Sequence, residues 1–393
     1  MPLSINLTVF KNFFRSGSAG GIILFACVII SLIIANSPLW KDFEALLATP
    51  LGYENSSIHL RYSLQLWIND GLMAIFFLMV GLEIKRELVE GELSSVKKAA
   101  LPILCAVGGA CVPAFIYMML NKGEPTASGW GIPMATDIAF ALAIITLLGK
   151  RVPASLKIFL AALAIVDDLM AILVIALFYS SDLHYMNLIY AAGIFLILLL
   201  FNRMGIKNLL FYLIPGLLIW YFVHHSGIHA TIAGVLTAMT VPTNPTATES
   251  PLEKLEHMLL KPVNFIIVPL FALSNTNIHF EPVMLEGLLS PLGLGIIAGL
   301  VIGKPVGILL ASWIGTKTGI GQLPANAKWI HIVGVGLLAG IGFTMSIFIA
   351  LLSFIDPFLV AEAKFSILVG SILSGTLGYL LLSRTKNRQQ FAN

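Results

Sequence analysis

Charged residues are scarce in this chain of 393 residues. Asp, Glu, Lys and Arg make up 11% of it, against about 25% in an ordinary soluble domain. Hydrophobic residues make up 58%, and the mean hydropathy is +0.93. Because so few charged side chains cannot cover a soluble protein of this length, lipid must replace water over much of the surface. The composition excludes a water-soluble globule and indicates a polytopic membrane protein.

Cysteine is also scarce, and its placement excludes two further classes. The three cysteines, Cys27, Cys105 and Cys111, all lie in apolar runs. Their spacing matches neither a disulfide framework nor a zinc or iron–sulfur motif, so we expect small buried side chains. We expect no resident cofactor and no nucleic-acid partner. The lipid bilayer is the partner that the composition requires.

Long apolar runs are abundant instead. A helix needs about 20 apolar residues to cross a hydrocarbon core about 30 Å thick. Runs of this kind, separated by charged or Pro/Gly-rich breaks, predict an all-α membrane protein with twelve transmembrane helices. We expect one integral membrane domain over residues 1–393, with an external loop at 41–61, either a small β-hairpin or irregular, and a cytoplasmic tail at 384–393. The runs cover residues 17–36, 62–88, 96–120, 126–148, 154–179, 186–202, 208–223, 227–241, 254–275, 291–313, 328–352 and 361–383.

The basic residues indicate the orientation. With a cytoplasmic N-terminus, most of the 23 Lys and Arg residues fall in inside segments, and the outside segments hold only Lys41, Arg61 and Lys122. The positive-inside rule therefore places both termini in the cytoplasm. A cleaved signal peptide over 11–37 is the alternative for the first run, although no small-x-small cleavage site stands out there.

Four ionisable residues lie near the middle of predicted spans: Asp137, Asp167, Asp168 and Lys304. Each costs about 2.5–3.5 kcal/mol at a helix centre on insertion scales. Four such groups at matching depth must face one another or a watery cavity, because lipid cannot solvate them. We therefore expect them to form a transport site.

The adjacent carboxylates of Asp167 and Asp168 diverge by about 100° around a helix. One of them can hold a cation while its neighbour pairs with Lys304. Oxygen ligands without nearby Cys or His suit Na⁺, Li⁺ or Ca²⁺ better than a transition metal. Protons and the cation compete for the same carboxylates. A cation that displaces the lysine from its aspartate would release charge, and this exchange is how an antiporter couples two flows.

Two spans carry helix breaks at similar depth. Gly131 and Pro133 interrupt the fourth span, and a glycine cluster from Gly334 to Gly342 interrupts the eleventh. Corresponding interrupted helices in two halves of a chain are typical of inverted-repeat transporters, although either break alone is also typical of a packing kink. Asp137 can offset the positive helix ends at such a break, and Lys304 the negative ends.

Further titratable residues lie near the two membrane surfaces. Glu83 and Glu87 share a helix face at the cytoplasmic end of the second span, and Glu256 and His257 begin the ninth on the same side. They form either a pH-sensing funnel or a solvated charge run. On the outer side, Asp70 marks a candidate vestibule, and His229 is either an interfacial histidine or a pH sensor.

Six motifs, in order along residues 12–383, closely resemble the NhaA family of bacterial sodium/proton antiporters. They are Leu66-Trp67-Ile68-Asn69-Asp70, Val80-Gly81-Leu82-Glu83-Ile84-Lys85-Arg86-Glu87-Leu88, Ala135-Thr136-Asp137-Ile138-Ala139-Phe140-Ala141-Leu142, Val166-Asp167-Asp168, Gly303-Lys304-Pro305 and Gly340-Ile341-Gly342-Phe343-Thr344-Met345-Ser346-Ile347-Phe348.

The resemblance implies inverted repeats formed by spans three to five and ten to twelve, with spans four and eleven crossing at their breaks. It implies electrogenic exchange across the inner membrane, with more than one proton entering for each Na⁺ or Li⁺ expelled. Asp168 would be the principal cation ligand, and Asp167 would take up a proton or pair with Lys304. Thr136 would assist near the site, while Asp137 and Lys304 would neutralise helix ends.

The resemblance also implies regulation and assembly. The external loop matches a dimer contact in the family, so we expect a homodimer through residues 41–61. One departure concerns span nine, where the family pattern can show a second histidine a turn after His257 and this chain has Leu259-Leu260-Lys261. Positions that match residues tied to pH response are Glu83, Arg86, Glu87, Glu256, His257 and His229.

Two other classes remain as alternatives. A cation-coupled symporter of similar architecture would carry an organic solute, whereas an antiporter dissipates a pH gradient with Na⁺ alone. An intramembrane aspartyl protease needs carboxylates on separate helices that meet at one water molecule. Here Asp167 and Asp168 are adjacent, and a Gly-x-Gly-Asp motif is absent from the sequence.

Overall fold

The structure is a computed structural model that describes residues 19–55, 59–180, 183–244 and 249–385. Most of the expected tail at 384–393 and part of the external loop lie outside these residues. The helices are α2 (Ala19–Ala35), α3 (Trp40–Ala48), α4 (Leu64–Leu66), α5 (Met73–Val89), α6 (Val96–Leu120), α7 (Ile138–Leu147), α8 (Ala154–Phe178), α9 (Tyr185–Arg203), α10 (Leu210–His224), α11 (Ile232–Thr240), α12 (Pro251–Pro262), α13 (Val268–Asn275), α14 (Pro282–Gly287), α15 (Pro291–Ala298), α16 (Lys304–Lys317), α17 (Trp329–Ala339), α18 (Phe343–Ser353) and α19 (Pro357–Ser383).

Several of these helices continue through turns of other helical types. Three π-helical turns, η1 (Trp67–Leu72), η5 (Val263–Ile267) and η6 (Gly299–Gly303), precede α5, α13 and α16 without a break in the chain direction. The 3₁₀ helix η3 (Pro125–Met134) leads toward α7, and η2 (Glu92–Ser94) and η4 (Gly149–Arg151) are short connections. Turns of π type occur often at functional sites, and η6 ends directly before Lys304.

The membrane character predicted from composition agrees with the helices. Seven of the described helical segments are long and apolar enough to cross a membrane, and three bent pairs bring the number to as many as ten. Helices α10 and α11 correspond to the seventh and eighth predicted spans, with only 15 and 9 residues. The protein is therefore a mostly helical membrane protein.

Two of the bent pairs fall at the predicted breaks. Helices η3 and α7 meet at 41° across Ala135–Asp137, and α17 and α18 meet at 47° across Gly340–Gly342. The two breaks touch, since the Asp137 N–H donates to the Ile341 carbonyl at 2.6 Å. Pro133 is not itself the break, because η3 continues to Met134 as a 3₁₀ helix. The crossing brings four helix ends to one point inside the protein.

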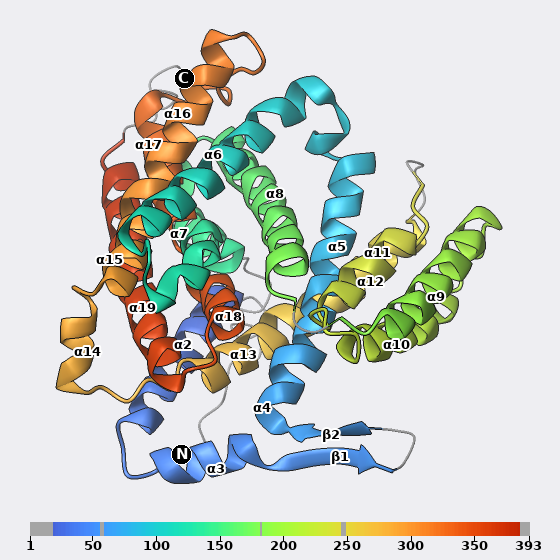
Figure 1. Ribbon diagram of the computed structural model, residues 1–393. Helices are drawn as coiled ribbons and strands as arrows, with labels where there is room; N and C mark the ends of the chain where they lie inside the picture. The colour runs from blue at the N-terminus through green and yellow to red at the C-terminus, as the bar shows by residue number, and fades with distance from the viewer. Residues whose placement is uncertain (1–18, 56–58, 181–182, 245–248, 386–393) are drawn as a thin grey trace, which may run out of the picture.

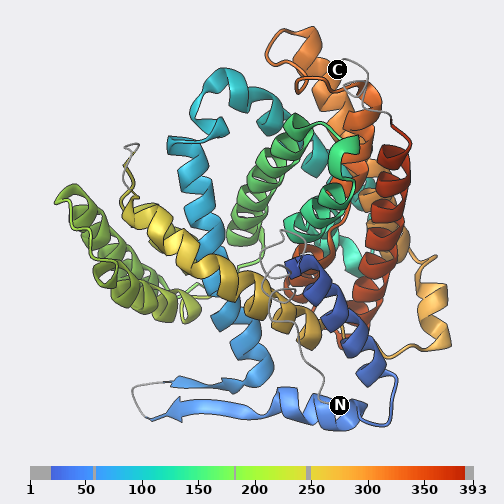
Figure 2. The same cartoon turned by 180° about the vertical axis from the view of Figure 1, so that it is seen from behind.

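Buried apolar side chains form two cores that share α5. The larger core joins α6, α8 and α15 to α19, and the smaller joins α9 to α12. Phe77 and Val80 of α5 lie in the larger core, whereas Leu78 and Leu82 lie in the smaller. Figures 1 and 2 show α9 and α10 as a hairpin of helices at one side, separated from the larger bundle by α5.

Glycines allow α6 and α16 to pack backbone against backbone. A Cβ atom on Gly108 would lie 2.5 Å from the Gly307 carbonyl oxygen, and one on Gly307 would overlap the Gly108 carbonyl. Such close approach is typical of small residues at membrane helix interfaces. It holds Lys304, one turn before Gly307, against the face of α6 that carries Gly109.

The external loop at 41–61 contains both a helix and paired strands. Its first half is α3, and β1 (Pro50–Glu54) pairs antiparallel with β2 (His59–Ser63), with Gly52 opposite Arg61. Gly52 has φ +117°, a conformation that side chains other than glycine rarely adopt. Figure 1 shows this hairpin at the end of the molecule away from the C-terminus.

Candidate cation site

Asp137 caps two helices at the crossing. One carboxylate oxygen accepts from the Phe140 N–H of α7 at 3.1 Å. The other accepts from Thr344 of α18, from its N–H at 3.1 Å and its hydroxyl at 2.5 Å. Both contacts lie at helix N-termini, where orphan N–H groups carry partial positive charge. A single buried carboxylate therefore serves both positive ends of the broken helices.

Lys304 also lies at the crossing and is fully buried. Its ammonium donates to the carbonyl of Met134, the last residue of η3. It also contacts Asp167 Oδ2 at 2.5 Å. The lysine thus meets the negative end of one broken helix and one of the two adjacent carboxylates.

Thr136 connects the same carboxylate to the second broken helix. Its hydroxyl lies 2.5 Å from Asp167 Oδ2 and 2.8 Å from the carbonyl of Ala339, the last residue of α17. A hydroxyl has one hydrogen, so it donates to only one of these acceptors at a time. A proton on Asp167 would satisfy both contacts, since the carboxyl would donate to Thr136 and Thr136 to Ala339.

Asp167 and Asp168 each have one enclosed carboxyl oxygen without a partner. Both side chains lie on α8 and are buried, 3% and 2% exposed. Oδ1 of each carboxyl group has no hydrogen-bond partner among the described residues. Burying an unsatisfied carboxylate is costly, so both oxygens need a proton or a cation. The pair can therefore hold a proton or a cation, while Lys304 contacts the other oxygen of Asp167.

The titratable residues near the end of α5 and on α12 fall into two groups. Arg86 of α5 pairs with Glu256 of α12 at 3.1 Å and lies 3.5 Å from Glu87. His257 lies outside this cluster, because its 68% exposed side chain pairs with Glu249 at 2.9 Å. The adjacent residues Glu256 and His257 thus have different partners. The spacing of the predicted pH-response residues did not distinguish them.

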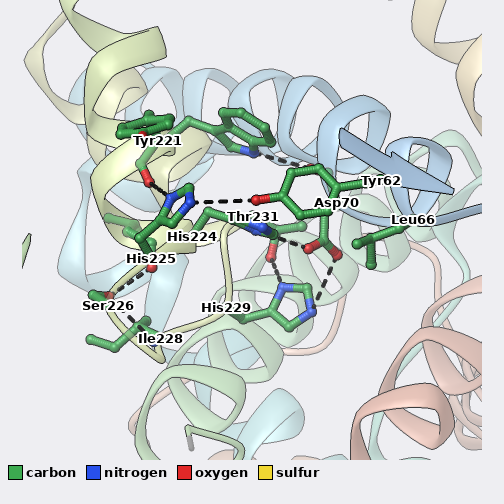
Figure 3. A network of polar contacts seen from close by, with 12 residues as sticks. Tyr62, Leu66, Asp70, Tyr221, His224, His225, Ser226, Ile228, His229 and Thr231 are labelled. Carbon is green, nitrogen blue, oxygen red and sulfur yellow. Dashed lines mark hydrogen bonds and ion pairs between the residues drawn. The ribbon is translucent and has the colours of Figure 1, made fainter. Parts of the chain in front are cut away.

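Asp70 and His229 lie close together before the start of α5, with a further partner that the sequence did not predict. Asp70 lies 3.3 Å from His224 Nδ1 and 3.7 Å from His229 Nε2 (Figure 3). The side chains of all three are only 13–15% exposed. His229 therefore belongs to a different group from Arg86 and Glu256. In the sequence, His224, His225 and His229 are three histidines within six residues, and this grouping was the available signal for His224.

A second contact in Figure 3 joins this cluster to the hairpin. The Tyr62 hydroxyl donates to the His59 carbonyl at 2.8 Å and lies 3.4 Å from His225 Nε2. His225 Nδ1 lies 2.8 Å from the Tyr221 carbonyl, so this nitrogen carries a hydrogen. Tyr62 thus connects strand β2 to the residue that follows α10.

Thr344 also has a place in the site that sequence reasoning did not assign. Its residue type was visible in the motif after the glycine break, but its contact with Asp137 depends on how α18 crosses η3 and α7. Ser346 adds a further link, because its hydroxyl donates to the Ile132 carbonyl at 2.7 Å. Hydroxyl side chains after the break therefore replace helix hydrogen bonds that the crossing interrupts.

Comparisons with known proteins agree with this architecture. The sequence pattern of the family described as Na+/H+ antiporter 1 matches residues 11–382. The chain is 63% identical to Na(+)/H(+) antiporter NhaA 2 of Flavobacterium johnsoniae over 392 residues, 99% of this chain and 96% of the relative. It is 50% identical to Na(+)/H(+) antiporter NhaA of Flavobacterium psychrophilum, with 95% of each chain covered. With the NhaA antiporter of Caulobacter vibrioides the identity is 48%, over 97% and 92% of the two chains.

The buried carboxylates between broken membrane helices and these relatives define a secondary transporter, not an enzyme. The chain belongs to the NhaA family of sodium/proton antiporters. The resemblance seen in the six sequence motifs is thereby confirmed over nearly the full length.

Proposed function

We propose that this protein expels Na⁺ or Li⁺ from the cytoplasm in electrogenic exchange for more than one proton, by alternating access and under control of pH. The observation that carries the proposal is the pair of enclosed, unpartnered oxygens on Asp167 and Asp168. Carboxylate oxygens are the ligands that hard cations such as Na⁺ and Li⁺ prefer. The transported Na⁺, Li⁺ and H⁺ are cargo, and no resident cofactor takes part.

In this mechanism Asp168 is the principal cation ligand and Asp167 is its switchable neighbour. A cation arriving from the cytoplasm binds both carboxylates, and Lys304 leaves Asp167. After outward release of the cation, each carboxyl group takes a proton from the outer side and delivers it to the cytoplasm. Two protons entering for one Na⁺ leaving move one net positive charge inward. Two exchangeable carboxyl groups support a stoichiometry above one proton per cation.

The broken helices give this exchange its fixed frame. Asp137 and Lys304 neutralise helix ends that would otherwise face each other across the membrane interior, and Thr136 adjusts to the protonation state of Asp167. Twelve spans with inverted repeats over spans three to five and ten to twelve fit the paired bends at 41° and 47°. Alternating access would move one repeat against the other around the fixed site.

The proposal extends to location, assembly and regulation. We place the protein in the bacterial inner membrane with both termini in the cytoplasm, as the basic residues favour. Two copies would pair through the β1–β2 hairpin, whose strand Pro50–Glu54 is exposed along its whole length. Regulation by pH would involve the cytoplasmic residues Glu83, Arg86, Glu87, Glu256 and His257, and on the outer side His229 with Asp70 at the vestibule.

Transport by inside-out membrane vesicles with an imposed pH gradient tests the proposal. Na⁺ or Li⁺ alone, with no organic solute, should dissipate the gradient, whereas K⁺ should not. Asp168→Asn should abolish the response, and Asp42→Asn, which alters an exposed carboxylate of α3, should leave it unchanged. Full exchange by Asp168→Asn would refute the site. Dissipation only in the presence of an organic solute would favour the symporter instead.

A further inference from the structure

Lys85 joins the cytoplasmic end of α5 to the end of α11. Its ammonium donates to the carbonyl of Met239 at 2.8 Å and to that of Val241 at 2.5 Å. These carbonyls belong to the last turn of α11 and to the residue that follows it. The last carbonyls of a helix have no partner within the helix and carry partial negative charge. Lys85 therefore caps the C-terminus of a neighbouring helix with a full positive charge.

Other side chains hold the same end of α11. Asn202 of α9 donates to the Thr240 carbonyl at 2.7 Å, so three consecutive carbonyls each accept from a side chain of another helix. Beyond them, the Thr243 hydroxyl donates to Glu90, the residue that follows α5. Residues 239–243 are thus fastened to the end of α5 at two points, of which only Lys85 brings a positive charge.

Helices α5 and α11 also pack without free space between them. A Cβ atom on Gly81 would lie 2.7 Å from Ala238 Cβ, and one on Gly234 would overlap the Ala74 carbonyl oxygen. Neither helix can slide past the other without separating first. Displacement of the end of α11 must therefore displace the end of α5.

The end of α5 also carries the cytoplasmic cluster. Arg86, the next residue after Lys85, pairs with Glu256 of α12, and Glu83 lies less than one turn before it. The structure describes no ion pair between Lys85 and a carboxylate, so its charge acts on the helix end and, over a longer range, on the acidic groups. The charged or titratable residues that these segments carry are Glu83, Arg86, Glu87 and Glu90 on α5 and directly after it, and Glu249, Glu253, Lys254, Glu256 and His257 on and before α12.

We propose that Lys85 is a positioning residue for pH-dependent exchange: its ammonium holds the end of α11 against α5 and so fixes Glu83 and Arg86 opposite Glu256. This inference rests on the proposed antiport. Removal of the charge leaves two carbonyls without their donor and frees the end of α5. It also removes a positive charge beside the acidic groups, which then hold their protons at higher pH. Activation of exchange should consequently move toward alkaline pH.

The test compares three substitutions in inside-out vesicles, each assayed for Na⁺-driven exchange over a range of pH. Lys85→Met keeps the length of the side chain without charge or donor, and it should move the midpoint of activation to alkaline pH by about one unit, the scale of one lost electrostatic interaction. Lys85→Arg keeps both charge and donors and should restore the wild-type profile. Lys254→Met, the matched control on exposed α12 surface, should not move the profile.

Each result decides between the alternatives. A wild-type profile for Lys85→Met would overturn the inference, as would an identical shift for Lys254→Met. If Lys85→Met does not accumulate in the membrane, Lys85→Gln is tested instead, because its neutral amide keeps N–H donors without the charge. An unshifted profile for Lys85→Gln would then overturn the role of the charge. Failure of the wild-type protein to exchange Na⁺ for protons would instead refute the proposed function.

Discussion

Asp137 and Thr344 meet across the crossing of two broken helices, where the carboxylate accepts both the N–H and the hydroxyl of the threonine, at 3.1 and 2.5 Å. The same carboxylate caps α7 through Phe140. One residue thus joins the two halves of the crossing, and the stability of the crossing should depend on it.

Thr344→Val removes the hydroxyl bond but keeps the backbone bond, so we expect a loss of about 1–2 kcal/mol in unfolding free energy. Asp137→Ala leaves the N-termini of α7 and α18 uncapped, and lost caps cost about 0.5–2 kcal/mol each, so its loss should be larger. Thermal unfolding of the purified protein in detergent measures both. Thr318→Val, at the surface-exposed end of α16, is the control. Equal melting temperatures for Thr344→Val and wild type would contradict the capping role.

The pair formed by Lys304 and Asp167 should be strongly coupled. Lys304→Met leaves the buried carboxylate of Asp167 without its lysine partner. The unfolding free energy should fall by about 3–5 kcal/mol, as is typical when one partner of a buried ion pair is removed. The double variant Lys304→Met/Asp167→Asn should recover part of that loss, because it leaves no uncompensated charge. A double-mutant cycle of melting temperatures measures the coupling. Simple additivity of the two single losses would show that the pair is not formed.

Binding of the cation should release protons from the purified protein. In weakly buffered solution, addition of Na⁺ should acidify the medium, because the cation and protons compete for Asp167 and Asp168. Asp168→Asn should lose the response, whereas Thr136→Val should retain it with a weaker apparent affinity. Addition of choline chloride at equal ionic strength is the control. Acidification by Asp168→Asn equal to that of the wild type would place the exchangeable proton elsewhere.

The same competition gives the sign of the pH dependence. As cytoplasmic pH falls, protons occupy the carboxylates that the cation needs, so the apparent KM for Na⁺ should rise toward acid pH and fall toward alkaline pH. At subsaturating Na⁺, the rate should therefore increase with pH until the supply of protons limits exchange. Rates measured in vesicles at several Na⁺ concentrations and pH values separate KM from the maximal rate. A KM for Na⁺ that does not change with pH would contradict competition of the cation and protons for the same carboxylates.

The sequence was sufficient to predict much of the candidate site. Asp137, Asp167, Asp168 and Lys304 were identified because a charge within an apolar run is costly in any fold. The breaks were predicted because glycine and proline weaken helices locally. From the residues alone, the partner of Lys304 was a choice between two aspartates, and the family resemblance implied Asp167. The structure pairs it with Asp167, since adjacent residues of α8 point in directions about 100° apart.

Other contacts could not be predicted in this way. His224 is one of three neighbouring histidines, and only the packing of α10 beside η1 brings it to Asp70. Glu256 and His257 are adjacent in sequence, yet the first pairs with Arg86 and the second with Glu249. Lys85 is one basic residue in a charged run, and only the position of α11 gives it two carbonyls to cap.

By itself, the sequence determined that this protein is a membrane protein, which spans contain a helix break and which side chains are too polar for lipid, because each follows from residue type and spacing along one chain. The tertiary structure alone decided which helix ends meet at Asp137 and Lys304 and which carboxyl oxygens remain unpartnered. Those contacts join residues far apart in the sequence, and their distances depend on close packing between helices, which no local pattern records.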